Sequence, residues 1–526
     1  MPEKTGNADN RITQLFSGFL YTCDANNRNL QRILSDNKHT EFGEKFRFAD
    51  ISSAEEFAEA VPAAEYDDFK AYIQRMYSGE DNLLTAYPVR NFILSSGTKG
   101  TVKRFPLTEE SLKRYSSYIV DMPMQLIEAD SQKMIHTSVF RPAGELGETL
   151  LSSAYYSYLD SNGLLPEYLG GRGLLFSDMI NDVPYVKLRI MLAYRDISAI
   201  HSIFLYDVLL LLRYLETNSA MLLDDIQNGS ISVDLPQQIK EQISRLPRVD
   251  DDRISELRAI LKDGLDASTL TAIWTNIRYI SGIGGPAYEA QTRILKKYTG
   301  DIPIYYFAYA SSEVMAGVAI EADKAEYALL PQSAYYEFIP ADCQEPVMMD
   351  QLAAGGIYEP VVTTFSGLYR YRTGDLIRII RFEGQTPVFE ILGRRNDVFN
   401  IAGEKIDAAS MQEAVKTASE SLSEIGDFCI AADYEVIPAR LHIFAETGAD
   451  RCQLAEELDR NLRALSADYD DIRGLGMLEM PRATCLQNGA ISHAFFNQNS
   501  HSKPKLFLTQ KQYEQLKSEV SAREAK

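Results

Sequence analysis

The chain has 526 residues, of which 45% are hydrophobic, so it is long enough to form at least two globular domains. Its 53 basic and 74 acidic residues give a formal net charge of −21, which provides no general positive field for a polyanion. We therefore expect neither a nucleic acid nor a membrane surface as a partner, and any phosphate-bearing ligand must be bound locally.

The five cysteines and six histidines argue against two further kinds of site. The cysteines are odd in number, far apart and without CxxC spacing, which favours reduced thiols and a cytoplasmic location. The histidines form neither HxxxH nor HExxH, so the sequence predicts no zinc site. The N-terminus lacks the apolar core of a signal peptide. The most apolar run, residues 202–215, is too short to span a bilayer, and we interpret it as a buried helix.

The hydrophobic pattern predicts an α/β fold with a large N-terminal domain of parallel and mixed sheets. Helical spacing dominates residues 10–80, and residues 236–266 are typical of charged amphipathic helices. Residues 277–280 and 302–309 are predicted strands separated by a helix, and strand–helix–strand order implies a parallel pair. A further helix is predicted to begin at Thr108, because its hydroxyl can cap the helix and the two glutamates that follow suit the positive end of the helix dipole.

The second half of the chain is predicted to contain antiparallel strands and then a smaller α+β domain. Residues 327–339, 359–364 and 376–382 are the predicted strands. The polar segment GRRNDVFNIAGEKI, residues 393–406, separates two apolar patterns, and we predict domains at 1–395 and 396–526. The second domain is predicted to contain helices at 408–419 and 452–465, with strands at 428–433, 439–445 and 477–479.

The stretch LSSGTKGTVK, residues 94–103, has the composition of a phosphate-binding loop. An apolar strand end is followed at once by Ser95, Ser96, Gly97 and Thr98. Glycine lets the backbone approach an anion closely, and short hydroxyls add donors that strengthen when the ligand is charged. The Walker A spacing GxxxxGK[ST] is absent. An ordinary polar hairpin is the alternative interpretation.

Two later segments carry side chains suited to a nucleotide. In YASSE, residues 309–313, Tyr309 could stack on a base, Ser312 could bind a phosphate or carboxylate, and Glu313 could hold magnesium. We place this segment at the end of a parallel strand, where open α/β sheets bind ligands. The alternative is a chance helix cap formed by Ser312 and Glu313.

In YRYRTGD, residues 369–375, a carboxylate follows a glycine and precedes a predicted strand. Ionised Asp375 can accept two hydrogen bonds side by side, which suits the vicinal hydroxyls of a ribose. The alternative is a surface salt bridge between Asp375 and Arg370 or Arg372. Arg394, near the predicted domain boundary, could reach the same nucleotide.

In this order, the three segments resemble the phosphate loop, the YGxTE-like segment and the aspartate segment of the adenylate-forming ANL superfamily. GRRNDVFNIAGEKI is similar to that superfamily's hinge, GRxDDxIKxxGxRI. Further motifs resemble one family within it, the auxin-responsive Gretchen Hagen family of acyl-acid amido synthetases. These motifs are NxxLQxIL and NxxTEFG within 27–43, Val61-Pro62 with Tyr66, the SSGT loop, YYEFIP at 335–340, TFSGLYRYR at 364–372 and GEK at 403–405.

The resemblance implies a two-step reaction with ATP and Mg²⁺. A carboxylic acid would attack the α-phosphate of ATP to give an acyl adenylate, and an amine, commonly an amino acid, would then displace AMP. Lys103 matches the lysine of the superfamily form SGTTGxPK. The family's catalytic lysine segment, QYKTPR, corresponds to SHSKPK at 500–505, which points to Lys503 with a one-residue shift, or to Lys505. The small domain would act as a mobile lid, and a monomer is favoured.

Three other functions compete with this interpretation. An acyl-CoA ligase shares the adenylation step and ends in a thioester. A dinucleotide-dependent oxidoreductase would use residues 282–287, which fit GxGxxA between a strand and a helix. A degenerate adenylate-forming scaffold with a binding role is the third alternative.

Overall fold

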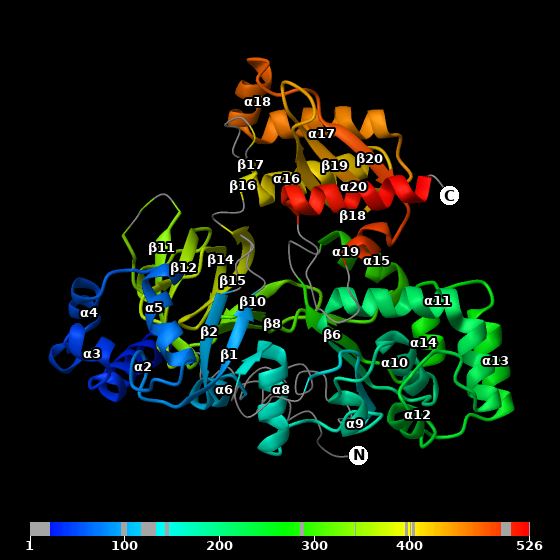
Figure 1. The fold of residues 1–526 in the computed structure, drawn as a ribbon, viewed down its shortest axis with the longest axis horizontal. Helices are drawn as coiled ribbons and strands as arrows, with labels where there is room; N and C mark the ends of the chain where they lie inside the picture. Colours follow the sequence, from blue (N-terminus) through cyan, green and yellow to red (C-terminus); the bar gives the residue numbers. More distant parts are fainter. Residues whose placement is uncertain are drawn as a thin grey trace. The chain divides into compact units, whose positions relative to one another are not determined.

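The computed structural model describes residues 22–95, 103–116, 133–141, 147–284, 289–341, 343, 345–394, 398–399, 401, 406–495 and 506–524. The chain divides into two compact units, shown with their elements in Figure 1. Unit 1 comprises residues 1–284 and 296–391, and unit 2 comprises residues 285–295 and 392–526.

Unit 1 begins with the predicted helices and a small sheet. The helices are α2 (Thr22–Asn37), α3 (Glu41–Lys45), η2 (Phe48–Asp50), α4 (Ala54–Ala60), α5 (Tyr66–Tyr77) and α6 (Glu109–Ser116). The sheet has the order β2-β1-β4, with β1 (Val89–Ser95), β2 (Lys103–Thr108) and β4 (Gly147–Thr149). Thr108 Oγ1 accepts a hydrogen bond from Ser111 N at the start of α6, which confirms the predicted helix start.

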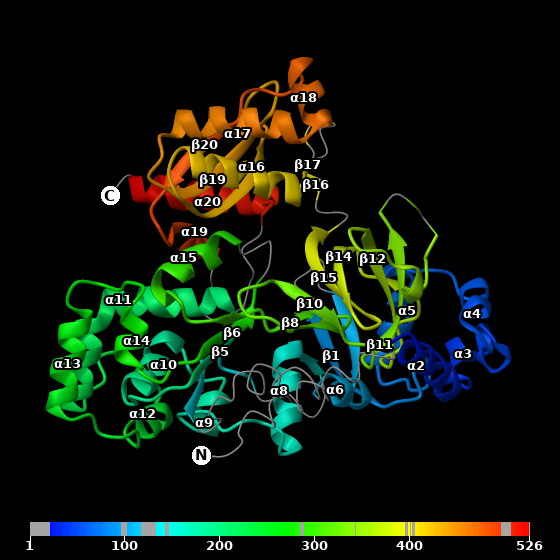
Figure 2. The same cartoon turned by 180° about the vertical axis from the view of Figure 1, so that it is seen from behind.

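A second sheet of unit 1 is parallel throughout its registered pairs. Its order is β3-β5-β6-β7, with β3 (Met134–His136), β5 (Ala199–Phe204), β6 (Tyr279–Ile283) and β7 (Ile304–Tyr305). Ile280 pairs with Ile304, so the predicted parallel pair is confirmed. The accompanying helices are α8 (Leu151–Ser161), α9 (Arg172–Leu175), α10 (Val183–Leu192), α11 (Leu205–Asn228), α12 (Gln237–Ile243), α13 (Asp251–Leu261) and α14 (Thr269–Ile273). The next helix, α15 (Glu289–Thr299), crosses the division between the units, because residues 285–295 belong to unit 2 and residues 296–391 to unit 1. Helices α10 to α14 lie together beside β5 and β6 in both views (Figures 1 and 2).

The apolar run 202–215 is not one helix. Its first residues end β5, and α11 begins only at Leu205. Most residues of the run are buried in both elements, so hydrophobicity alone does not mark the change from strand to helix.

The largest sheet of unit 1 has eight strands in the order β11-β12-β14-β15-β10-β9-β8, with β13 paired to β12. The strands are β8 (Ala308–Ala310), β9 (Met315–Ala319), β10 (Glu326–Leu329), β11 (Ala334–Pro340), β12 (Ile357–Thr364), β13 (Tyr371–Arg372), β14 (Asp375–Glu383) and β15 (Thr386–Arg394); η5 (Met349–Gln351) precedes β12. Glu337 pairs with Val361, so the predicted antiparallel pairing of this region is confirmed. Residues 327–339 form two strands, because Pro331 has no N–H for a sheet and a turn closes between Ser333 and Leu330.

Unit 2 is an α+β unit with helices on both faces of one sheet. Its elements are β16 (Val398–Phe399), β17 (Ile406–Asp407), α16 (Ala408–Ser421), β18 (Ile425–Asp433), β19 (Arg440–Thr447), α17 (Arg451–Leu465), α18 (Ala467–Gly474), β20 (Arg482–Leu486), α19 (Ala490–Phe495) and α20 (Gln510–Glu524). In β18, Ile430 packs with the α16 and α17 residues Met411 and Leu458, whereas Cys429 packs with Tyr513 of α20.

The predicted strand at 477–479 is wrong. The third strand of this sheet, β20, starts at Arg482 and runs parallel to β19. Leu478 is buried in the core without joining the ladder, so its apolar character reflects packing rather than strand structure.

Among the helices of the described ranges, none has the length and apolarity needed to cross a membrane.

Candidate functional site

Tyr309 and Asp375, predicted separately from two segments, lie in contact. The Tyr309 hydroxyl donates a hydrogen bond to Asp375 Oδ2 over 2.6 Å, and both residues are buried. Asp375 is the first residue of β14, as expected. The alternative of a surface salt bridge is wrong, because Arg370 pairs with Glu337 and Arg372 pairs with Glu359.

The position of Tyr309 differs from the prediction. It does not end a parallel strand, because the chain turns after Tyr305, where Phe307 N donates to Tyr305 O, and then enters a different sheet. There Tyr309 stands opposite Gly317 in an antiparallel pair. A Cβ at Gly317 would lie 2.9 Å from the Phe389 ring and 3.3 Å from Tyr309 Cβ, so this glycine allows the close packing around the tyrosine.

Ser312 and Glu313 lie in the bend between β8 and β9. The alternative of a helix cap is wrong, because no helix begins here and Ser311 Oγ instead accepts from the backbone of Glu313 and Val314, each over 3.3 Å. Glu313 Oε1 accepts a long hydrogen bond of 3.5 Å from the hydroxyl of Tyr371. This bend therefore brings a carboxylate to the segment that leads to Asp375.

Gly374 provides open space beside Asp375. Its φ of +74° lies in the left-handed region, and a Cβ at this position would meet no heavy atom of the described residues within 4 Å. A larger side chain would be strained and would project into that space. The residue that precedes the carboxylate predicted to bind a ribose is thus not covered by other described side chains.

The two ends of the predicted phosphate loop are paired strands. Ser95 stands opposite Lys103 in the ladder between β1 and β2. Lys103 Nζ lies 5.1 Å from the centroid of the Tyr66 ring, and its side chain is exposed. Ser96, Gly97 and Thr98 lie outside the described residues, as does the side chain of Ser95.

Aromatic rings connect this loop to the bend at Glu313. Tyr66 packs against Phe105 with a centroid distance of 5.3 Å, and Phe105 packs against Tyr371 at 5.8 Å. Tyr371 in turn reaches Glu313. The sequence motif YRYRTGD assigns no role to Tyr371, but its alternation with Arg370 and Arg372 is the pattern of a residue on the opposite face of a short strand.

The structure does not describe the side chains of the remaining predicted residues. Arg394 ends β15, but its side chain lies outside the described part of the chain. Lys503 and Lys505 lie entirely outside it. Among the described residues, no group of three or more His, Cys, Asp or Glu side chains gathers as a preformed metal site.

The glycines of the GxGxxA segment have a packing explanation. A Cβ at Gly282 would lie 3.0 Å from Leu205 N, and one at Gly284 would lie 2.7 Å from the Tyr306 ring. Residues 285–287 of this segment lie outside the described ranges. Close packing therefore accounts for both described glycines without a dinucleotide.

Three family models match successive parts of the chain. They are the GH3 family N-terminal domain at residues 20–304, the GH3 family central domain at 327–394 and the GH3 family C-terminal domain at 409–505. The chain belongs to the GH3 family. This confirms the resemblance found in the motifs, since these GH3 domains extend over most of the sequence.

Individual GH3 relatives are distant but extensive. Indole-3-acetic acid-amido synthetase GH3.3 of Arabidopsis thaliana is 28% identical over 448 residues, which cover 79% of this chain and 75% of the relative. Jasmonoyl--L-amino acid synthetase GH3.5 of Oryza sativa subsp. japonica is 27% identical over 503 residues, covering 86% of each chain.

Solved structures show the same fold. The GH3.15 acyl acid amido synthetase superposes with a TM-score of 0.85 at 22% identity, covering 98% of this chain and 97% of that one. A 2-hydroxyisobutyryl-CoA ligase in complex with 2-HIB-AMP has a TM-score of 0.53 at 11% identity, covering 99% and 96%. The predicted adenylate-forming fold is confirmed.

Proposed function

We propose that this GH3-family chain is an ATP-dependent acyl-acid amido synthetase. It would join a carboxylic acid to an amine, with an amino acid as the expected acceptor. The relatives named above, which are amido synthetases of indole-3-acetic acid and of jasmonate, support the reaction class. The observation that carries the proposal is the contact between Tyr309 and Asp375, because it brings two segments that the resemblance assigns to one nucleotide within 2.6 Å.

In this proposal the described residues bind and orient the nucleotide. Asp375 accepts hydrogen bonds from the ribose hydroxyls, and the Tyr309 hydroxyl holds the carboxylate in place. The space beside Gly374 receives the sugar. Ser312 and Arg394 contact the nucleotide or the adenylate.

The phosphates are assigned to the loop between β1 and β2. Ser95, Ser96, Gly97 and Thr98 supply hydroxyl and backbone donors, and Lys103 supplies a cation at the end of the loop. Phosphoryl chemistry needs positioned donors around developing charge rather than an enzyme nucleophile.

Glu313 is the proposed protein ligand of Mg²⁺. Nucleotide-bound magnesium takes one or two protein carboxylates and completes its coordination with phosphates and water, so a single carboxylate at this bend fits the ion. When bound, magnesium would neutralise charge on the phosphates. The Tyr371 hydroxyl, 3.5 Å from Glu313 Oε1, is a described side-chain group that would help to place this carboxylate.

Two half-reactions follow from these roles. A carboxylate oxygen of the acid attacks the α-phosphorus of ATP and pyrophosphate leaves; the amine nitrogen then attacks the acyl carbon and AMP leaves. Lys503, or Lys505 in its place, supplies the catalytic cation of the small domain. We assign that domain to 396–526 and the nucleotide-binding domain to 1–395, and we propose a monomer in the cytoplasm.

A pyrophosphate-release screen tests the proposal. Purified protein is incubated with ATP and Mg²⁺ and a panel of carboxylic acids, with and without each amino acid or CoA, and products are identified by mass spectrometry. We expect pyrophosphate release that requires an acid, and an amide product that requires an amino acid. A thioester formed only with CoA would replace the amide assignment with an acyl-CoA ligase, and a protein that ignores ATP would contradict the proposal.

A further inference from the structure

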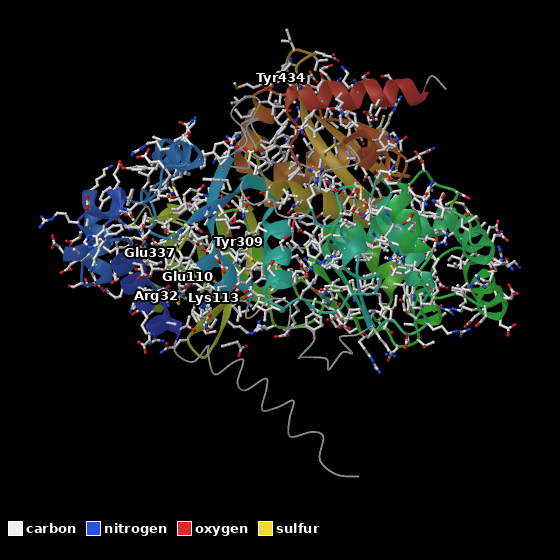
Figure 3. All side chains as sticks on the ribbon, turned by 60° about the horizontal axis from the view of Figure 1, so that its bottom comes forward. Arg32, Glu110, Lys113, Tyr309, Glu337 and Tyr434 are labelled. Carbon is white, nitrogen blue, oxygen red and sulfur yellow. The ribbon has the colours of Figure 1, made fainter. Side chains whose placement is uncertain are left out.

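Arg370, the residue before Tyr371, forms a buried ion pair with Glu337. The Arg370 guanidinium forms a fork with Glu337 of β11, with Nε donating to Oε2 over 2.9 Å and Nη2 donating to Oε1 over 2.9 Å. Its remaining nitrogen, Nη1, donates to Ala58 O over 2.7 Å and to Val61 O over 2.6 Å. Side chains of the pair are 6% and 1% exposed. Glu337 is labelled in Figure 3.

The backbone of Arg370 is held as firmly as its side chain. Its φ of +45° lies in the left-handed region, which is uncommon for a residue other than glycine. Arg370 N donates to Thr363 Oγ1 over 2.9 Å, and Arg370 O accepts from Ala64 N over 3.0 Å. The next bond, from Arg372 N to Ala64 O, extends the same bridge across Tyr371. The strained residue therefore sets the direction in which the chain enters β13.

A second buried carboxylate continues this arrangement to Asp375. Glu359 of β12 is 1% exposed and accepts from both Nε and Nη2 of Arg372. It also accepts from Gly374 N over 3.2 Å. Thr373 then donates to Pro360 O through its hydroxyl, and the same hydroxyl oxygen accepts from Asp375 N. Successive residues from 370 to 375 are thus fixed by side chains on β11 and β12 and by the loop before α5.

Stability alone gives a weak reason for a buried ion pair. Removing two charges from water is costly, and replacing such a pair with packed hydrophobic residues is often neutral or stabilising. Burial raises the pKa of Glu337, and its hydrogen bonds with Arg370 oppose that rise. The two parallel hydrogen bonds between the Arg370 guanidinium and the Glu337 carboxylate instead fix the distance and the orientation of Arg370 relative to β11.

We propose that Glu337 and Arg370 form a positioning pair, which holds Tyr371 and Asp375 in the geometry that binds ATP. The inference rests on the proposed function, because it deepens the nucleotide role of Asp375. Neither member is a catalytic residue, since each acts through the segment 371–375 rather than by touching the nucleotide.

The test separates nucleotide binding from folding. KM for ATP, KM for the acid and kcat are measured by pyrophosphate release for the wild type, Glu337→Gln and Arg370→Lys. We expect KM for ATP to rise by about 10-fold to about 100-fold, the range that losing a hydrogen bond to a charged group such as Asp375 costs in binding. KM for the acid and kcat should change much less. A purely structural role would lower the active fraction, and therefore the apparent kcat, while leaving KM for ATP unchanged in the molecules that fold.

Arg75 and Glu41 provide a matched control pair. Arg75 also makes a two-bond contact with a glutamate, through Nη1 and Nη2 to Glu41 over 2.9 and 2.7 Å, and it pairs with Glu80 as well, but the Arg75 and Glu41 side chains are 41% and 46% exposed. Arg75→Lys and Glu41→Gln should leave KM for ATP at the wild-type value. An unchanged KM for ATP in Glu337→Gln and Arg370→Lys would overturn the inference, and so would failure of both variants to fold. If the wild type releases no pyrophosphate, the proposed function fails, and ATP binding measured by calorimetry on the same variants decides the inference separately.

Discussion

Tyr309 donates a hydrogen bond to Asp375 Oδ2 over 2.6 Å, and Tyr185 of α10 donates one to Asp225 Oδ2 of α11 over 2.7 Å. Both aspartates are buried, at 7% and 1% exposure, and both lie in unit 1. The contact itself is the same at the two places. What differs is the surroundings of each carboxylate, and that difference separates a structural aspartate from a candidate ligand-binding one.

Asp225 is saturated by protein donors. Ser230 Oγ and Ser232 Oγ donate to Oδ1, and Ser232 N shares Oδ2 with Tyr185. Burial alone would raise the pKa of Asp225, but the hydrogen bonds from Ser230, Tyr185 and Ser232 outweigh burial and lower the pKa. The carboxylate therefore ties the chain that leaves α11 back to α10.

Asp375 has a different neighbourhood. It starts β14 next to Gly374, where a Cβ would meet no atom of the described part of the chain within 4 Å. Two residues that precede it, Arg370 and Gly374, are held by hydrogen bonds to the buried carboxylates of Glu337 and Glu359. A carboxylate on a segment that neighbouring strands fix, next to a glycine that no other described side chain covers, is suited to accept hydrogen bonds from a ligand. The comparison teaches that hydrogen-bonded burial of an aspartate is not in itself a sign of function.

The largest expected effect comes from removing the negative charge of Asp375. Asp375→Asn keeps the size of the side chain but removes its charge, and we expect adenylation measured as pyrophosphate release to fall about 100-fold, near the ~3 kcal/mol typical of a lost preorganised group. Asp225→Asn is the matched control and should lower thermal stability while leaving KM for ATP unchanged. Equal loss of activity in both variants would show that the two aspartates do not differ in role.

Sequence patterns identified Asp375 and the parallel pair because each signal is local. A glycine followed by an aspartate and an alternating strand predicts a carboxylate at a strand end, and this is what β14 shows. Strand, helix and strand in order fix the pairing of β6 with β7 by topology alone. The family motifs added the adenylate-forming fold, because a resemblance over most of the chain includes pairings that no local pattern specifies.

The sequence could not predict the switch of sheets at Tyr309 or the buried carboxylates. Residues 302–309 contain no glycine, and their one proline precedes β7, so nothing local marks the turn after Tyr305. Glu337 stands in the apolar strand YYEFIP, and its partner Arg370 follows 33 positions later. Such a pairing arises from tertiary structure, and a sequence pattern shows only an unexpected charge in a buried strand.

Tyrosine hydroxyls in unit 1 also contact a buried histidine ring, which is neutral rather than charged. His201 of β5 lies between Tyr168, whose OH is 2.9 Å from Nδ1, and Tyr279, whose OH is 2.7 Å from Nε2, with the His136 ring 6.5 Å away. Burial lowers the pKa of His201 to about 4. An unfolded histidine has a pKa of about 6.5, so we expect unit 1 to lose up to about 3 kcal/mol as pH falls from 6.5 to 4.

Urea unfolding of the wild type and of His201→Phe between pH 7 and 4 measures this effect. The variant should be less stable at pH 7, and its stability should fall less steeply with acid. His442 of unit 2 has a pKa lowered to about 3, chiefly by burial, and adds an acid dependence of its own in both proteins. The difference between the two slopes therefore isolates His201, and identical slopes would contradict its assignment as a buried neutral group.

A smaller effect comes from removing each tyrosine hydroxyl. Hydrogen bonds to charged groups contribute about 1.5 kcal/mol or more, so Tyr309→Phe should raise KM for ATP about tenfold by loosening Asp375. Tyr185→Phe should instead lower the free energy of unfolding by a similar amount, because Asp225 and Arg189 each lose a buried partner. Titration of ATP in the pyrophosphate assay and urea unfolding of both variants test this exchange of roles. If Tyr309→Phe loses stability but keeps the wild-type KM for ATP, Asp375 is a structural aspartate like Asp225.

The smallest expected effect is the loss at low pH of the stability that ionised Asp225 contributes. Because hydrogen bonds outweigh burial and lower the pKa of Asp225, its ionised form stabilises the fold above the unfolded pKa of about 3.9. That contribution is lost as pH falls through the lower folded-state pKa. The stability gap between the wild type and Asp225→Asn, measured by urea unfolding, should therefore be constant above about pH 5 and should narrow below about pH 4. A gap that stays constant down to pH 3 would mean that the serine and tyrosine donors do not favour the carboxylate over the neutral acid.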